Sequence, residues 1–385
     1  MLLAKSLAAS LQCPACAATQ WGEVAHTGDS ASGAIECSSC GRHWLVVDGV
    51  PLMAAPVPPA NRGGSLLERL ERDVEARRVV QAALGRFDAS LGGLGGVLRH
   101  VRSGSLQQAF QIPDAPWISL SRFEWKKYEL LGRIAPEGDT LLDLGCGYGP
   151  SAASFLPSRR VRRVIGVDEN LLFLLLFKRY ATERELGEVA LICGDASRMP
   201  LPLRDSTADV IIGASFFNHF VCLKSSRAIR AFFGELSRLS RPRGTLLLDM
   251  VPNRQYPFPT EVNLGEVVSQ PRLREWCFRI LRRLPCRWLP GRLTVTMLWC
   301  GYRLYAIGGR RPALDLTSFK REVGKALPES AVGGLPFRPR SYDRMVEGFA
   351  RTELFDERRL HGEGQLARVD GAAFDIPYFL LRSTR

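Results

Sequence analysis

The chain has no apolar run long enough to cross a membrane as a helix, and it shows no internal repeat or long low-complexity segment. Residues 1–11 are largely apolar, but they lack the basic stretch that precedes the apolar part of a secretory signal. These absences favour a globular protein in which residues 1–11 belong to the first folded domain. A chain of 385 residues, 46% of them hydrophobic, is expected to form two or three domains with sizeable cores.

The most informative segment, residues 141–150, combines an apolar strand, a glycine turn and the start of a helix. Glycines at 145, 147 and 149 let the backbone turn tightly and approach a ligand, as in nucleotide-binding loops. A dinucleotide fingerprint would need glycine or alanine at position 150, where this chain has Pro150. Asp143 would repel a pyrophosphate, but it suits a cationic ligand with an ammonium and a sulfonium group. The pattern therefore indicates S-adenosylmethionine (SAM).

Strand-like segments recur downstream of this loop. They cover 162–167, 189–193, 208–214 and 245–249, and a helix is predicted over 227–239 with a turn at 240–244. Strands that alternate with helices predict an α/β fold with a doubly wound, mostly parallel sheet. Asp168 follows the second strand, at the position whose carboxylate binds ribose hydroxyls in such folds.

These motifs together resemble the class I SAM-dependent methyltransferases, most closely the group with the ubiquinone and menaquinone methyltransferases. The resemblance covers about residues 120–250 well and the last 45 residues more loosely, and it implies a Rossmann-like sheet of seven strands. The chain departs from the family at Arg243, which replaces a glycine. The resemblance implies that the glycine loop holds the methionine part of SAM, Asp168 the ribose and Asp195 the adenine amino group. The expected cofactor-binding residues are Asp143, Gly145, Cys146, Gly147, Gly149, Asp168, Glu169, Asp195, Ala196 and Ser215.

Four of the ten cysteines form two C-x2-C pairs separated by twenty residues. This spacing is typical of a tetrahedral zinc site, whose four thiolates leave no open position and so make its role structural. The alternative is a redox or disulfide arrangement, but the first pair lacks the context of a thioredoxin motif. The predicted metal ligands are Cys13, Cys16, Cys37 and Cys40. The other six cysteines, at 146, 193, 222, 277, 286 and 300, are expected to be reduced thiols, as in a cytoplasmic protein.

Residues 42–53 and both cysteine pairs resemble the small zinc-ribbon activator subunit of eukaryotic and archaeal methyltransferase complexes. The resemblance implies that the ribbon docks on the methyltransferase part of the chain or on its substrate. Binding of nucleic acid by the ribbon is disfavoured, because residues 1–60 contain two cations, Lys5 and Arg42, against four acids.

Basic residues outnumber acidic ones by 52 to 39, and much of the excess follows the fifth predicted strand. Residues 251–312 contain eleven Arg and three Glu. Around Trp276, apolar residues at helical spacing share one side and arginines the other, until Pro285 ends the helix. Three interpretations stay open for this segment: a lid over the substrate, a membrane-surface helix within 272–307, and an RNA-binding face.

The remaining elements are predicted from periodicity and from glycine or proline breaks. We expect an amphipathic helix from Leu66 to Leu84, a break at Gly92–Gly96 and a segment from Trp117 to Leu131 that caps the SAM site. A helix at 342–349 and an edge strand at 374–381 are expected to end the chain. The predicted domains are the zinc ribbon (1–56), a linker and helical segment (57–118), the SAM-binding core (119–250), a basic insert (251–335) and a C-terminal part that completes the sheet (336–385).

Catalytic residues are marked less clearly. Methyl transfer from a sulfonium is an in-line displacement in which positioning and desolvation contribute much of the rate, so a general base is not always needed. His219 is the candidate base for an oxygen nucleophile, and local hydrogen bonding at a helix start is its alternative role. Neither the Asn-Pro-Pro-Tyr of amino methylation nor the Pro-Cys of cytosine methylation follows the fourth strand.

The sequence therefore favours a methyltransferase that acts on oxygen or carbon of a small-molecule or lipid-like acceptor, in the cytoplasm or at a membrane surface. Two alternatives are an rRNA or tRNA methyltransferase that uses the ribbon and the Arg-rich insert, and a degenerate scaffold without activity. The intact SAM motifs argue against the scaffold. The oligomeric state is not indicated by the sequence.

Overall fold

The computed structural model describes residues 3–26, 29–59, 65–85, 87–104, 128–129, 131–132, 134–196, 200–214, 216, 226–252, 349, 351–356 and 378–385. The chain divides into two compact units. The first contains Met1–Ala214, Glu235–Leu247 and Thr384–Arg385, and the second contains Ser215–Gly234 and Leu248–Ser383. The domain boundaries predicted from the sequence stay predictions.

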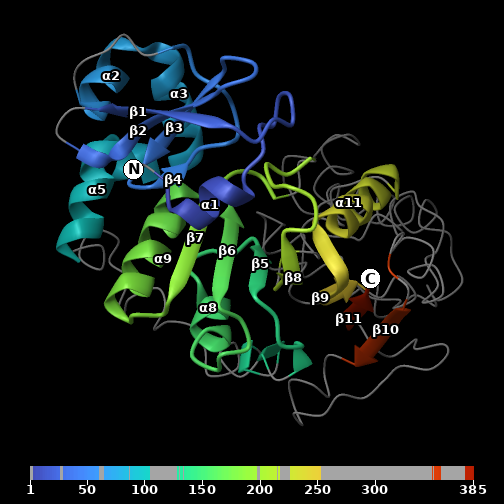
Figure 1. The fold of residues 1–385 in the computed structure, drawn as a ribbon. Helices are drawn as coiled ribbons and strands as arrows, with labels where there is room; N and C mark the ends of the chain where they lie inside the picture. The colour runs from blue at the N-terminus through green and yellow to red at the C-terminus, as the bar shows by residue number, and fades with distance from the viewer. Residues whose placement is uncertain are drawn as a thin grey trace, which may run out of the picture. The chain divides into compact units, whose positions relative to one another are not determined.

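The first unit begins with helix α1 (Lys5–Ser10) and a small antiparallel sheet, which Figure 1 shows in blue. Its strands, in spatial order, are β1 (Trp21–His26), β2 (Asp29–Cys37), β3 (His43–Val47) and β4 (Val50–Pro51). Asp48 and Gly49 both have positive φ, so this Asp-Gly pair forms the tight turn that joins β3 to β4. The sheet buries the Trp44 ring, which meets the Trp21 ring edge-on at 5.5 Å. We call residues 3–59 the N-terminal module.

Four helices follow: α2 (Leu66–Arg72), α3 (Val74–Leu84), α4 (Phe87–Ser90) and α5 (Gly93–Ser103). The single helix predicted from 66 to 84 is correct in its helical content but wrong in its continuity, because the structure has two helices that meet at Asp73. The Asp73 carboxylate accepts hydrogen bonds from the N–H groups of Glu75 and Ala76, so it caps α3 where α2 ends. We call residues 66–103 the helical layer.

The predicted break at Gly92–Gly96 is wrong in part. The backbone of Gly92 is in the left-handed region, with φ of 71°. Helix α5 nevertheless begins at the next residue and contains three of the glycines of the predicted break. Leu94 and Val97 on this helix are buried, and this packing offsets the low helix propensity of glycine. A Cβ at Gly96 would overlap with the carbonyl group of Leu91, so glycine is required where α5 approaches the preceding turn.

The larger sheet of the first unit has the spatial order β9-β8-β5-β6-β7 (Figure 1). Its strands are β5 (Thr140–Leu144), β6 (Arg163–Asp168), β7 (Glu188–Cys193), β8 (Ala208–Gly213) and β9 (Ser240–Pro252). Strand β5 pairs in parallel with β6 and β8, and β6 pairs in parallel with β7. Helices α8 (Pro150–Phe155) and α9 (Leu171–Glu183) lie between successive strands in the chain. The predicted α/β fold with a Rossmann-like parallel sheet is confirmed.

The order of the strands places a topological switch point at β5, because the chain proceeds to β6 and β7 on one side and returns to β8 on the other. Ligands of open α/β sheets bind outside the carboxyl ends of the strands at such a point. The glycine loop follows β5 directly, so the fold places it at this position.

Helix α11 (Ser226–Leu239) agrees with the predicted helix, but the turn predicted at 240–244 is part of strand β9. The main-chain N–H of Arg385 donates to the carbonyl oxygen of Gly244 at 3.0 Å, and the Arg241 side chain binds the Asp209 carboxylate of β8. These partners hold 240–244 within the sheet, and Arg243, with φ of 65°, keeps a local turn inside the strand.

In the second unit, β10 (Arg351–Asp356) neighbours β11 (Tyr378–Thr384). The predicted final strand at 374–381 agrees with the start of β11, and its first four residues lie outside the described ones. The insert predicted at 251–335, apart from its first two residues, and the helix predicted at 342–349, apart from its last residue, also lie outside them. Among the described residues, no helix combines the length and apolar character that a membrane span needs.

Candidate functional site

The glycine loop joins β5 to α8 and is shaped by three residues in the left-handed region. Gly145, Gly147 and Gly149 have φ of 68°, 52° and 88°. The N–H groups of Gly145 and Cys146 both donate to the carbonyl oxygen of Val167 in β6, at 2.8 and 3.2 Å. The glycine spacing therefore turns the backbone back over the neighbouring strand, as the sequence predicts.

Asp143 lies inside β5 and is 2% exposed. Its carboxylate accepts a hydrogen bond from the Ser151 hydroxyl in the first turn of α8. A buried charge needs such partners. Asp143 thus joins β5 to the helix after the loop, and its predicted affinity for a cationic ligand stays a prediction.

Asp168 ends β6 and connects the loop to α9. Its Oδ2 accepts from the Gly147 N–H and its Oδ1 from the Asn170 N–H, both at 2.9 Å. Asn170 in turn caps α9, because its Oδ1 accepts from the Phe173 N–H at 3.3 Å. Burial raises the pKa of Asp168, although the two N–H donors lower it.

Three acids predicted to bind the cofactor act on one another at the carboxyl ends of β6 and β7. Asp168 pairs in register with Cys193, the last residue of β7, and Asp195 follows two residues later. Burial raises the pKa of Glu169, and the charges of Asp195 and Asp168 raise it further. This end of the sheet therefore carries concentrated negative charge, which attracts a cationic ligand.

Two cysteines near these acids are buried and reduced. Cys146 in the loop and Cys193 at the end of β7 are free thiols with 3% and 2% exposure. Burial raises the pKa of both thiols, and the charge of Asp168 raises them further. Both are buried free thiols, as predicted, and the predicted contact of Cys146 with the cofactor stays a prediction. Ala196, also buried, follows Asp195.

The aromatic side of α9 was not predicted from the sequence. A Cβ at Gly149 would overlap with the Phe177 ring, and the Phe173 ring lies 6.2 Å from the Tyr148 ring in edge-on geometry. Phe173 and Phe177 are one helical turn apart, so a single face of α9 packs on two successive loop residues. The available signal was this i, i+4 aromatic pair directly after Asn170, the residue that begins the helix.

Other predicted site residues lie outside the described ones. These are Ser215 and the candidate base His219, together with most of the segment from Trp117 to Leu131 that was expected to cap the site. Their roles stay predictions.

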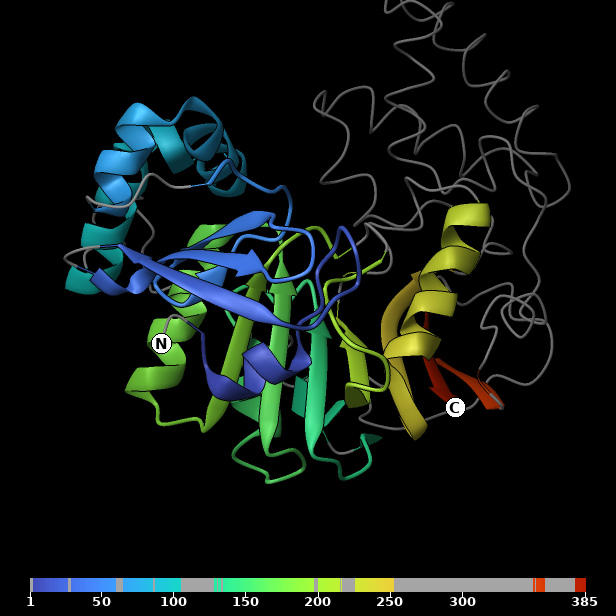
Figure 2. The ribbon, with the colours of Figure 1, turned by 45° about the horizontal axis from the view of Figure 1, so that its top comes forward.

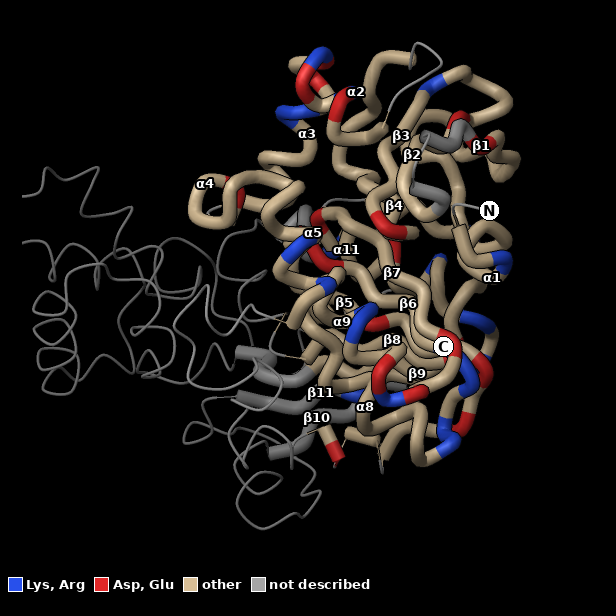
Figure 3. Tube along the Cα trace, turned by 90° about the vertical axis from the view of Figure 1, so that its left-hand side faces the viewer, with Lys and Arg blue, Asp and Glu red and all other residues tan. Residues whose placement is uncertain are grey.

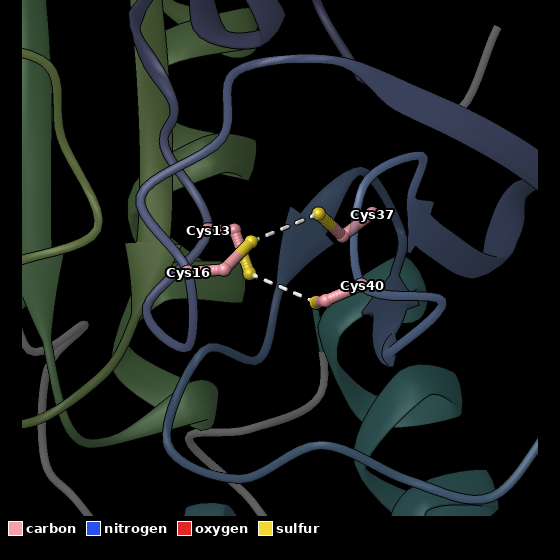
Figure 4. Close-up of side chains that lie close together, drawn as sticks. All are labelled: Cys13, Cys16, Cys37 and Cys40. Atoms are coloured by element: carbon pink, nitrogen blue, oxygen red, sulfur yellow. Dashed lines mark hydrogen bonds between the residues drawn. The ribbon is translucent and has the colours of Figure 1, made fainter.

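The four cysteines of the two C-x2-C pairs lie together (Figure 4). Their sulfur atoms are all within 4.8 Å of one another, with 3.7 Å between Cys13 and Cys40 and 3.6 Å between Cys16 and Cys37. A disulfide needs about 2.05 Å between sulfurs, so these distances fit separate thiols around one centre. Cys13 and Cys37 are buried, whereas Cys16 and Cys40 are exposed.

Backbone N–H groups prepare this cluster for thiolates. Burial raises the pKa of Cys37, but the N–H groups of Cys40 and Ser39, together with the side chains of Cys16 and Cys40, outweigh it and lower the pKa to about 7. At Cys13, burial dominates and raises the pKa to about 12. Cys37 is therefore more readily ionised than Cys13, and a bound cation would favour the ionised form of both.

The N-terminal module contacts the larger sheet at the end of β7. Leu52 forms a parallel bridge with Cys193, and the Met53 N–H donates to the Cys193 carbonyl oxygen at 2.8 Å. In Figure 1, β4 runs beside β7 at this end, and the turned view in Figure 2 shows the same neighbourhood. Lys178 of α9 adds an ion pair to Asp48 at 3.1 Å.

A second contact lies on the connection between β7 and β8. The Gln12 N–H donates to the Pro202 carbonyl oxygen at 3.2 Å, and Leu11 bridges Leu203. Arg204 donates to the carbonyl oxygens of Leu11 and Thr19, at 3.3 and 2.9 Å. The predicted docking of the ribbon segment on the methyltransferase part is thus present as contacts within the first unit.

Charge on the N-terminal module is sparse. In Figure 3, blue segments are few along α1 and the described parts of β1–β4, whereas blue and red alternate around the larger sheet. The sequence gives the same balance, with Lys5 and Arg42 as the cations of residues 1–60. A phosphate-binding surface needs clustered basic residues, so this part of the chain is not built as one.

Residues 142–248 match the family model described as a methyltransferase domain. This range contains the glycine loop, Asp168 and Asp195. The match shows that the chain carries a methyltransferase domain, and such a domain implies SAM as its cofactor. A search of curated proteins gave no match.

Three of the solved structures that resemble this chain have low sequence identity and low TM-scores. The complex of a Haloferax volcanii methyltransferase activator with a methyltransferase is 18% identical, covers 42% of this chain and 60% of that one, and has a TM-score of 0.27. The YcgJ protein of Bacillus subtilis is 17% identical, with coverages of 68% and 97% and a TM-score of 0.31. A SAM-dependent methyltransferase of Clostridium acetobutylicum is 15% identical, with coverages of 43% and 61% and a TM-score of 0.29.

Proposed function

We propose that this SAM-dependent methyltransferase methylates oxygen or carbon of a small-molecule or lipid-like acceptor. SAM as the methyl donor is supported by one observation. The glycine loop and three acids lie together at the carboxyl ends of β5, β6 and β7. The proposed acceptor class is supported by the sparse positive charge of the N-terminal module, which does not favour binding of a nucleic acid.

In this proposal, the cation of SAM lies over the glycine loop above Asp143, the ribose meets Asp168, and the adenine meets Asp195. Glu169 adds negative charge beside the ribose. Asp168 already holds Gly147 and Asn170 through one lone pair of each oxygen, so its remaining lone pairs are free for ribose hydroxyls. His219 is the proposed base where the acceptor atom is a hydroxyl oxygen.

The acceptor class can be tested by transfer of labelled methyl from SAM into separated cell fractions. The purified full chain is incubated with a lipid extract, a small-molecule extract and total RNA. We expect label in the lipid or small-molecule fraction, including molecules of the quinone kind, and none in RNA. Label confined to RNA would refute the acceptor proposal and support an rRNA or tRNA substrate for the Arg-rich segment 251–312. An Asp195→Ala variant serves as the control for dependence on the donor site.

We also propose that Cys13, Cys16, Cys37 and Cys40 hold a structural zinc ion. Zinc binds thiolates at about 2.3 Å, and a tetrahedron of that size has sulfur–sulfur edges of about 3.8 Å. The pairs at 3.7 and 3.6 Å fit those edges, so the donor set and its spacing suit zinc. A bound zinc would keep all four thiols ionised and cross-link residues 13–16 of the N-terminal module to residues 37–40.

Metal analysis of the purified chain tests this site. We expect one zinc per chain, lost in a Cys40→Ser variant and retained in a Cys193→Ser variant, whose thiol lies outside the cluster. A wild-type chain without bound metal, or a disulfide between cluster cysteines, would refute the zinc site.

The N-terminal module is proposed to fix the segment that carries Asp195. It binds Cys193 before this residue and residues 202–204 after it, so both flanks are held. We further propose that β10 and β11 complete a seven-stranded sheet, supported by the Arg385–Gly244 hydrogen bond at the end of β11. A cytoplasmic location with contact to a membrane surface through 272–307 fits a lipid-like acceptor and is part of the same proposal.

A further inference from the structure

Three aromatic rings from distant parts of the sequence form a continuous contact. Phe87 of α4 is 8% exposed, and its ring centroid lies 6.0 Å from that of Phe173, with 56° between the planes. The Phe173 ring then lies 6.2 Å from that of Tyr148, at 86°. Both geometries are favourable for aromatic pairs. The helical layer therefore reaches the glycine loop through one ring of α9.

The backbone of Phe173 is connected through Asn170 to Asp168, whose carboxylate also binds the glycine loop. The Phe173 N–H binds Asn170 Oδ1, and the Asn170 N–H binds Asp168 Oδ1. The other oxygen of Asp168 binds the Gly147 N–H, next to Tyr148. A displacement of Phe173 thus acts on the loop twice, through the Tyr148 ring and through the hydrogen bonds of Asp168.

The outer ring is held by the packing of the helical layer on α9. Helices α3 and α5 both pack against α9. The Arg179 guanidinium on α9 donates to the Val101 carbonyl oxygen at the end of α5 and also binds Glu183 at 2.5 Å. Phe87 is thus presented to Phe173 from a fixed direction.

We propose that Phe87 is a positioning residue for the donor site, acting through Phe173 on Tyr148 and the glycine loop. This inference rests on the proposed binding of SAM at that loop. The helical layer is then part of the donor site's support, although its sequence carries no methyltransferase motif. Removal of the Phe87 ring weakens SAM binding without removing any group that would touch SAM.

A double-mutant cycle of Phe87 and Phe173 tests the positioning role of Phe87. The dissociation constant for SAM is measured by calorimetry on the full chain for wild type, Phe87→Leu, Phe173→Leu and the double variant. We expect Phe87→Leu to weaken SAM binding roughly threefold to tenfold in the wild-type background, the range that one aromatic pair accounts for. In the Phe173→Leu background it has no further effect, because the connecting ring is absent.

Leu66→Ala is the matched control. Leu66 is 3% exposed and belongs to α2 of the same layer, so its loss lowers the melting temperature without touching the aromatic contact. Wild-type affinity in Phe87→Leu, equal weakening by Phe87→Leu in both backgrounds, or equal weakening by Leu66→Ala would overturn the proposal. A wild-type chain that binds no SAM would overturn the proposed function together with it.

Discussion

Gly149 is the loop residue with the strictest requirement for glycine. Its φ is 88°, and a Cβ at this position would overlap with the Phe177 ring of α9. Gly147 also has positive φ, but a Cβ there would meet nothing within 4 Å. Alanine substitutions at the two positions therefore distinguish two losses of stability. One comes from a left-handed backbone, and the other from overlap with a packed ring.

Gly149→Ala is expected to lower the free energy of unfolding by roughly 2–5 kcal/mol, the sum of backbone strain and overpacking. Gly147→Ala carries the strain alone and is expected to cost about 1–2 kcal/mol. Urea unfolding of both variants measures the difference. Equal losses would show that Phe177 does not restrict the loop.

Asp168 gives the donor site a pH dependence. Burial raises its pKa, so the carboxyl group stays protonated to a higher pH than a free one. Ionisation of Asp168 costs the ligand-free fold stability, which is therefore greater below this pKa and is lost as pH rises through it. Ribose binding needs the carboxylate, so SAM affinity should fall as pH falls through the same pKa.

SAM titrations across this pH range, for wild type and Asp168→Asn, measure the effect. The variant should bind more weakly at neutral pH and show a flatter pH profile, with Glu169 as the remaining acid whose pKa is raised. Parallel profiles for the two proteins would assign the pH dependence to another group.

At the scale of elements, the connection from β7 to β8 depends on the N-terminal module. Arg204 supplies two of its hydrogen bonds, to Leu11 and Thr19, and the Arg204 N–H binds the Ser10 carbonyl oxygen at 2.9 Å. Arg238 of α11 holds the other side of the same connection, since it binds Glu235 and the Leu203 carbonyl oxygen at 2.8 Å. This connection is thus fixed between two elements.

Arg204→Ala is expected to lower the free energy of unfolding by about 1–3 kcal/mol, because two charge-assisted hydrogen bonds to the module are lost. Arg162→Ala is the control, since its side chain is 88% exposed and its ion pair to Asp139 spans 3.9 Å. That control should change stability by less than about 0.5 kcal/mol. Chemical denaturation compares them, and equal effects would show that the Arg204 contacts contribute nothing.

Sequence patterns located the strands of the larger sheet, because each has an apolar run bounded by turn residues or acids. They also located Asp168 and the cysteine pairs, whose spacing is itself the signal. Helix α5 was missed, since three glycines hide it and its stability comes from Leu94 and Val97 in the core. The ring contacts of Phe173 and Phe177 were missed for a related reason: their i, i+4 spacing shows that they share a face of a helix, but it does not show which distant segment that face packs on.

At the scale of the molecule, one unit contains the cysteine cluster, the glycine loop and the acids. The cluster and Asp195 are linked through the contacts at Cys193 and residues 202–204. A change in the N-terminal module therefore reaches the donor site through the backbone on both flanks of Asp195.

If the cysteine cluster holds the proposed zinc, its removal by a chelator is expected to weaken SAM binding, and added zinc should restore it. Without the metal, the thiols no longer cross-link the module, and the segment with Asp195 loses its fixed flanks. In a Cys40→Ser variant the chelator should have no further effect. SAM affinity that is unchanged by metal removal would separate the two sites.

Calorimetric titration of the full chain with SAM tests the central claim most directly. The account predicts saturable binding of one SAM per chain, weakened at least about tenfold by Asp168→Ala and unchanged by Glu71→Ala, an exposed acid on α2. No saturable binding, or equal effects of the two substitutions, would contradict the assignment of the loop after β5 and its acids as the SAM site.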